Sequence, residues 1–185
     1  MSDATELLPL RARVALPGGG ACIMSGFPGL ESGVDGVAWI SPEMLEATLA
    51  ELARQGAERL LILTEESELP EGACTLLDAA LARHGIVGIA LPIRDFHAPE
   101  KAFLDAWAQL GPRLHAAHRA GGISALCCQY GAGRSGLVAA LILIEGGMAP
   151  DDAVAHVRAE FEDAVESDVQ MQWLQALSPG RPVTG

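Results

Sequence analysis

Short apolar runs of strand length alternate with longer stretches of helical periodicity along most of the chain. The runs at 58–64, 86–93 and 123–129 are bounded by turn or polar residues, which predicts buried strands. Apolar residues recur every three or four positions in the stretches between and after them, which predicts amphipathic or buried helices. These helices are expected at residues 42–55, 73–84, 99–120, 134–145, 150–161 and 168–177.

Glycine and proline divide these elements. Two apolar stretches, 11–16 and 21–27, flank the sequence PGGG and predict a β-hairpin. Ser41 followed by Pro42 is typical of a helix start, and Gly85 is typical of a helix end. Within residues 99–120, the pair Gly111-Pro112 predicts a bend or break, because proline removes a helical hydrogen bond.

Strands that alternate with helices predict an α/β fold. We expect a single domain over residues 1–185, with flexible ends at 1–10 and 179–185. Its architecture is a three-layer sandwich, in which a mixed, mostly parallel sheet of about five strands carries helices on both faces. Ligands of such sheets bind beyond the carboxyl ends of the strands.

The composition and charge of the chain disfavour some classes of binding partner. The formal net charge of −12 disfavours nucleic acid and anionic membranes. The apolar run 137–144 is too short to span a bilayer and is followed by Glu145, so it predicts a buried helix. The first residues lack the pattern of a signal peptide, and four cysteines are too few for a disulfide framework. A cytoplasmic, thiol-reducing location is therefore expected.

The sequence CCQYGAGRSG, residues 127–136, joins a predicted strand to a predicted helix. Cys128 and Arg134 are six positions apart, and Ser135 follows directly. Glycines in such a loop let the backbone curl until several N–H groups point inward, which forms an anion-binding nest at a helix N-terminus. The guanidinium of Arg134 would hold two phosphoryl oxygens, and the nest would stabilise a thiolate of Cys128. The predicted phosphate-binding residues are Gln129, Tyr130, Gly131, Ala132, Gly133 and Arg134.

This loop resembles the signature H-C-x5-R-[ST] of the cysteine-based protein tyrosine and dual-specificity phosphatases. The similarity covers most of the chain from about residue 21 and is greatest to the small bacterial members. LPIRDFHAP resembles the general-acid loop of the family, which makes Asp95 the expected acid. ESDVQMQWL resembles the segment whose glutamine orients the hydrolytic water, here Gln170. LTEESEL, at 63–69, resembles a family segment to which no role is assigned.

The resemblance implies a two-step phosphoryl transfer without metal or cofactor. Cys128 would attack phosphorus and form a phosphocysteine while Asp95 protonates the leaving oxygen. Asp95, with Gln170, would then activate water, and the hydroxyl of Ser135 would stabilise the departing thiolate. The neutral interior of the loop favours a phosphorylated protein, on tyrosine or on serine and threonine, or another phosphate monoester over a polyphosphoinositide.

The match departs at Cys127, where the family has histidine. Strand alternation predicts that Cys127 points away from Cys128 into the core, while Cys22, Cys74 and Cys127 remain candidates for a disulfide with an oxidised Cys128. A phosphate-binding module without turnover is an alternative function. A thiol redox protein is disfavoured because C-x-x-C is missing.

The acidic run Glu160, Glu162, Asp163 and Glu166 predicts a solvated face. The four histidines at helical positions (His84, His115, His118 and His156) predict surface or cap roles.

Overall fold

A glycine-rich turn joins the first two strands of a five-stranded sheet in the computed structural model, which describes residues 8–183. Leu16 N donates to Gly20 O at 2.9 Å and closes this turn. The strand order is β1-β2-β7-β5-β6; β1 pairs antiparallel with β2, and the remaining pairs are parallel. The strands are β1 (Leu10–Ala15), β2 (Ala21–Gly26), β5 (Ala57–Ile62), β6 (Val87–Ala90) and β7 (Ile123–Cys128).

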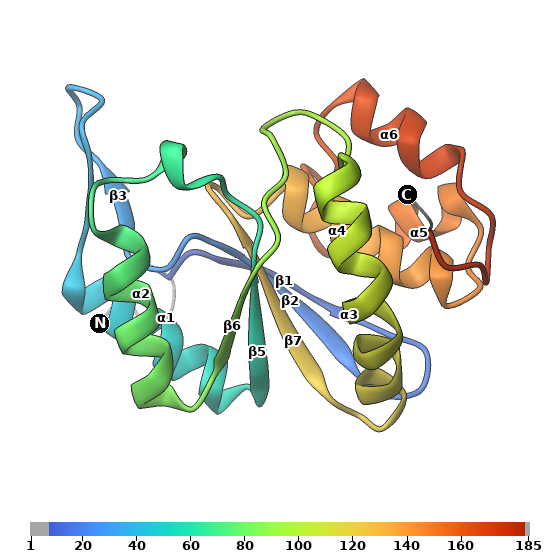
Figure 1. The fold of residues 1–185 in the computed structure, drawn as a ribbon, viewed down its shortest axis with the longest axis horizontal. Helices are drawn as coiled ribbons and strands as arrows, with labels where there is room; N and C mark the ends of the chain where they lie inside the picture. Colours follow the sequence, from blue (N-terminus) through green and yellow to red (C-terminus); the bar gives the residue numbers. More distant parts are fainter. Residues whose placement is uncertain (1–7, 184–185) are drawn as a thin grey trace.

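Helices cover both faces of this sheet, as Figure 1 shows. One face carries α1 (Pro42–Arg54) and α2 (Ala73–His84). The other carries α3 (Lys101–Arg119), α4 (Gly133–Glu145), α5 (Pro150–Glu160) and α6 (Asp168–Gln175). The three-layer α/β sandwich with a mostly parallel sheet is therefore confirmed.

Each face of the sheet has its own apolar core. On the α3–α6 side, α4 is the central element, and every residue from Gly133 to Ile144 is buried. This explains the continuous apolar run at 137–144, because a helix surrounded by protein has no polar face. None of the helices in residues 8–183 combines the length and apolar character that crossing a membrane requires.

The structure differs from the sequence prediction in three elements. Helix α3 continues through Pro112 without a break. Pro112 lies on the exposed side of α3, where water can satisfy the carbonyl group that proline leaves unbonded. Strand β6 ends at Ala90, although Leu91 N and Ile93 N still donate to Ile62 O and Leu63 O of the neighbouring chain segment. A small hairpin of β3 (Leu30–Ser32) and β4 (Ala38–Ile40), not predicted, projects from the same edge of the sheet as the loop after β7 (Figure 1).

Several backbone groups hold the two ends that the sequence predicts to be flexible. Gly26 N donates to Pro9 O at 2.8 Å, beside β1. At the other end, Gly180 N donates to Ile144 O at 2.8 Å, and Val183 N donates to Glu145 Oε1 at 2.7 Å. Residues 1–7 and 184–185 lie outside the described part of the chain.

Candidate active site

The loop between β7 and α4 forms the floor of the site. It follows Cys128, the last residue of a strand with parallel neighbours on both sides, and it ends at Gly133, the first residue of α4. Gly131 has φ +97°, and a Cβ at this position would overlap the backbone of Ser25 and Gly26 in β2. The loop therefore lies directly against β2, and glycine is required at its closest point.

The carbonyl groups of this loop are turned outward. Gln129 O accepts from Phe27 N at 3.3 Å, and Tyr130 O accepts from Arg11 Nε at 2.9 Å. Because the C=O and N–H of one peptide point in opposite directions, the N–H groups of Tyr130 and Gly131 face the other side of the loop. Gly131 N donates to Cys128 Sγ at 3.2 Å, as this orientation requires. The thiol is 3% exposed and lies at the floor of the loop.

Arg134 is buried and makes charged contacts with two other segments. Its Nη1 and Nη2 donate to Glu68 Oε1 and Oε2 at 2.6 and 2.8 Å, and Nη1 also donates to Ile93 O at 3.1 Å. Nη2 lies 3.2 Å from Asp95 Oδ1. Burial disfavours the charged guanidinium, but Glu68, Cys128 and Asp95 outweigh it and raise the pKa of Arg134. Arg134 is therefore a fixed cation beside Cys128.

Three buried polar atoms of Arg134 and of a residue in α6 have no hydrogen-bond partner within residues 8–183. They are Arg134 Nε and the amide nitrogen and oxygen of Gln170. Gln170 is fully buried in the first turn of α6, where its N–H donates to the capping hydroxyl of Ser167 at 3.2 Å. Helix α6 packs against α4, which begins with Gly133 and Arg134. Buried polar atoms are normally satisfied, so these atoms fit a site that receives a polar ligand and water.

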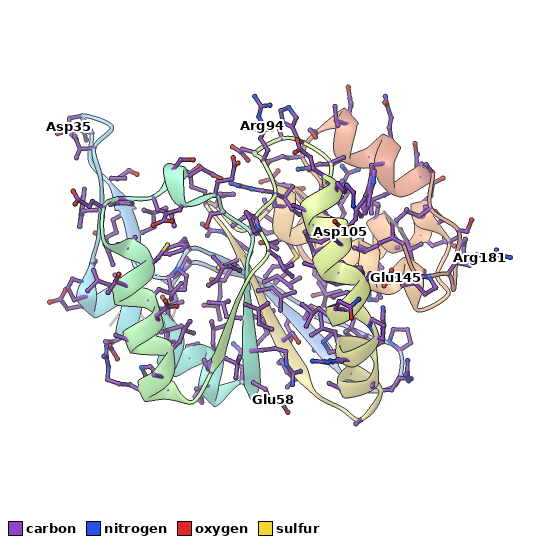
Figure 2. All side chains as sticks on the ribbon, viewed as in Figure 1. Asp35, Glu58, Arg94, Asp105, Glu145 and Arg181 are labelled. Carbon is purple, nitrogen blue, oxygen red and sulfur yellow. The ribbon has the colours of Figure 1, made fainter. Side chains whose placement is uncertain are left out.

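Asp95 lies in the connection between β6 and α3, where its side chain is about one-third exposed. Its Oδ1 accepts from Phe96 N at 3.2 Å in addition to pairing with Arg134. Neighbouring Arg94 is exposed and points outward from the same loop (Figure 2). Of these two adjacent charged residues, Asp95 is the one brought to Arg134, as the sequence analysis expects for a residue of the site.

Ser135 is also buried, and its hydroxyl donates to Leu126 O of β7 at 3.3 Å. The structure thus brings Cys128, Arg134, Asp95 and Ser135 together around one end of β7. Ala132 is buried in the turn, whereas Gln129 and Tyr130 form its exposed rim. The ring of Tyr130 lies under the guanidinium of Arg11, 4.2 Å from its carbon to the ring centroid.

Cys127 belongs to the opposite core. It packs with the residues under α1 and α2, whereas Cys128 belongs to the core under α3–α6, so the alternation predicted for the two cysteines is confirmed. Burial raises the pKa of the Cys127 thiol, and burial raises the pKa of Cys22 to about 12. All four cysteines are free thiols.

Two acidic residues of the site had no role in the sequence analysis. Glu68 holds Arg134 from a short 3₁₀ turn, Glu66–Glu68, in which its carboxylate also accepts from Glu65 N at 2.7 Å. Glu65 is not one of the residues that typically begin a capping box, so the spacing of Glu65 and Glu68 is only a weak sequence signal of this arrangement. Glu166 is exposed, as are the other members of the predicted solvated run, and it also places its carboxyl group against Gly133.

His118 also differs from the sequence prediction of a surface or cap role. It is 2% exposed, because α3 turns it toward the sheet, where Nε2 lies 2.9 Å from Ser124 Oγ. His115 contacts the carboxylate of Glu145 at 2.7 Å. Within residues 8–183, no group of three or more His, Cys, Asp or Glu side chains is arranged to hold a metal ion.

Comparison with known proteins agrees with this geometry. A family model described as the Swiss Army Knife protein DSP-PTPase phosphatase domain matches residues 36–184. The protein tyrosine phosphatase PRL-1 of Trypanosoma cruzi (strain CL Brener) is 33% identical over 109 residues, which cover 54% of this chain and 56% of that protein. The chain therefore matches little more than half the length of this relative.

Two solved structures have the same fold. The kinase associated phosphatase with its catalytic-site cysteine replaced by serine gives a TM-score of 0.73 at 20% identity, covering 91% of this chain and 93% of that one. The active form of Tk-PTP gives a TM-score of 0.63 at 26% identity, covering 89% and 96%. With the family model matching most of its length, the chain belongs to the cysteine-based protein tyrosine and dual-specificity phosphatase family.

Proposed function

We propose that the protein hydrolyses phosphate monoesters of phosphorylated proteins through a phosphocysteine on Cys128. The observation that carries this proposal is the position of Cys128 Sγ, which accepts from Gly131 N at the floor of the loop while buried Arg134 stands six residues further on. Inward N–H groups and a fixed guanidinium are suited to the equatorial oxygens of a phosphoryl group.

In the first step, the thiolate of Cys128 attacks phosphorus in line with the leaving oxygen. Backbone N–H groups of residues 129–134 and the guanidinium of Arg134 bind the phosphoryl oxygens, and Asp95 protonates the leaving oxygen. The S–P bond forms as the P–O bond breaks. The contacts of Arg134 to Glu68 and Ile93 O support this step, because they fix the guanidinium before substrate arrives.

In the second step, water attacks the phosphocysteine. Asp95 accepts a proton from the water, and the buried amide of Gln170 orients it, a role that its unpartnered nitrogen and oxygen support. The S–P bond breaks, inorganic phosphate leaves, and Ser135, next to Arg134 in the first turn of α4, stabilises the departing thiolate.

The loop itself favours a singly phosphorylated group. Its interior residues, Gln129 to Gly133, carry no positive side chain that would bind a further phosphate. Tyr130 is 54% exposed at the rim and offers an aromatic surface to a substrate side chain. A phosphorylated tyrosine, serine or threonine of a protein fits this arrangement, and small phosphate monoesters use the same chemistry.

The proposal is tested with an aryl phosphate, wild-type protein and Cys128→Ser across roughly pH 4.5 to 8. We expect hydrolysis that resists EDTA, decreases with vanadate and disappears in Cys128→Ser. A phosphotyrosine peptide and a phosphoserine peptide then separate the two substrate classes. Turnover that persists in Cys128→Ser, or no turnover in the wild type, would contradict the proposed enzymatic function. A wild type that binds vanadate without turnover would instead be a phosphate-binding module.

A further inference from the structure

The carboxyl group of Glu166 lies at the rim of the loop that carries Cys128. A Cβ on Gly133 would overlap this carboxyl group, so glycine at the first position of α4 leaves the space that Glu166 occupies. Glu162, Asp163 and Glu166 are all exposed and line one hollow beside the loop, but Glu166 is the one whose carboxyl group lies against Gly133. Glu166 is thus distinguished from its acidic neighbours by its position.

The segment that carries Glu166 is fixed on both sides. Arg158 donates from Nε to Ala164 O at 2.9 Å and from Nη2 to Val165 O at 2.8 Å. After Glu166, the hydroxyl of Ser167 donates to Phe96 O at 2.7 Å, which connects this segment to the loop of Asp95. The chain on both sides of Glu166 is therefore fixed, which places its side chain beside the loop.

Backbone conformation points to the same two loops. Phe96 and Val165, both with φ +58°, are the residues other than glycine that have positive φ within residues 8–183. Each of them is the direct neighbour of an acidic residue of the site: Phe96 follows Asp95, and Val165 precedes Glu166. Such strained conformations cost on the order of 1–3 kcal/mol each and are concentrated at functional sites.

The two carboxyl groups have different environments. Asp95 pairs with Arg134, and its Oδ1 also accepts from Phe96 N. Partial burial and then the charge of Asp95 raise the pKa of Glu166; Arg134 opposes this, and Asp163 adds to it. Arg158, which lines the same hollow as Glu166, donates instead to two carbonyl groups. Two carboxyl groups whose environments differ in this way are typical of an acid and a base that share one site.

We propose that Glu166 is a second proton-transferring carboxyl group of the active site, which acts together with Asp95. In the first step, protonated Glu166 gives its proton to the leaving oxygen as the S–P bond forms and the P–O bond breaks. In the second step, the carboxylate of Glu166 or Asp95 takes the proton of the attacking water as the S–P bond breaks. This inference rests on the proposed function and adds a residue to its machinery.

The test compares Glu166→Gln, Asp95→Asn and the double variant on two esters. Phenyl phosphate has a poor leaving group that needs a proton, and 2,4-dinitrophenyl phosphate has a good one that does not. With phenyl phosphate we expect kcat/KM to fall by about 10–10²-fold in each single variant and by about 10²–10⁴-fold in the double variant. With the dinitrophenyl ester the losses should be far smaller. Glu166→Gln should also shift the alkaline limb of the pH profile of kcat/KM.

Glu162→Gln is the matched control, because it removes one negative charge from the same acidic segment; its profile should equal that of the wild type. The inference is overturned if Glu166→Gln keeps the wild-type ratio between the two esters and the wild-type pH profile. An equal loss on both esters would also overturn it, since that is the result of a purely structural role. Failure of the proposed function looks different: neither ester would show Cys128-dependent hydrolysis, and both proposals would then be refuted.

Discussion

Glu68 and Arg134 form a two-pronged ion pair that joins the connection after β5 to the first turn of α4. Both guanidinium nitrogens donate to the carboxylate, at 2.6 and 2.8 Å, and the Arg134 side chain is 1% exposed. The contact fixes the guanidinium beside Cys128 and leaves its Nε without a partner. Since removing one partner of a buried pair leaves the other charge without compensation, Glu68 matters for both stability and anion binding.

Replacing Glu68 with glutamine tests this relationship. We expect the free energy of unfolding to decrease by on the order of 3 kcal/mol, because the buried charge of Arg134 loses its principal counter-charge. We expect vanadate to stabilise this variant more than it stabilises the wild type, since the anion supplies the missing negative charge. Denaturant unfolding with and without vanadate measures both effects. Glu66→Gln, in the same turn but exposed, is the control, and an equal response to vanadate in all three proteins would contradict the prediction.

Gly131→Ala should disable the loop through steric overlap with β2. Its φ of +97° disfavours any side chain, and a Cβ would also overlap the backbone of Ser25 and Gly26. Displacing the loop by about 1 Å is expected to lower kcat/KM by about 10²-fold. Gly147→Ala is a matched control: φ is +107°, and no atom lies within 4 Å of the new Cβ. It should cost about 1–2 kcal/mol of stability and leave turnover unchanged. Equal turnover in both variants would refute the steric argument.

Cys127→Ala should retain Cys128-dependent turnover. The side chain of Cys127 packs under α1 and α2, on the other side of the sheet from Cys128, and burial raises the pKa of its thiol. We expect only a packing loss of about 1 kcal/mol. Peptide mass spectrometry after peroxide treatment should find Cys128 oxidised without a bond to Cys127. A Cys127–Cys128 disulfide in the wild type would contradict this prediction.

His118 should make stability depend on pH below neutrality. Burial, followed by the charges of His115 and Arg59, lowers the pKa of His118 from 6.5 to about 4. Between these values the unfolded chain binds a proton at this residue that the folded chain does not, so stability falls as the pH falls from about 6.5 to 4. The loss amounts to at most about 3 kcal/mol. His118→Asn should flatten this part of the stability curve measured by denaturation, whereas His156→Gln, near the surface, should not. A curve unchanged in His118→Asn would be evidence against the mechanism.

Local signals in the sequence predicted most of the fold. Ser41 and Pro42 begin α1 as expected, and α2 ends at His84 before Gly85. The period of two along β7 placed Cys127 and Cys128 on opposite faces. These features depend on neighbouring residues, which is why the sequence reveals them.

The features that were missed depend on distant residues. Glu68 and Arg134 are 66 positions apart, and their pairing follows from the order of β5 and β7 in the sheet. His118 is buried because α3 faces the sheet at that turn, a property that a polar residue in a helical pattern does not reveal. Glu166 was indistinguishable from its exposed acidic neighbours until Gly133 was placed beside it.

The sheet separates two adjacent cysteines into different surroundings. Substitutions on the side of Cys127 are constrained by the volume available under α1 and α2, whereas those on the side of Cys128 are constrained by the chemistry of the loop. One peptide bond is the boundary between these two kinds of constraint. A volume change at Cys127 is thus expected to act on the packing under α1 and α2, whereas a change at the next residue alters the reactive group itself.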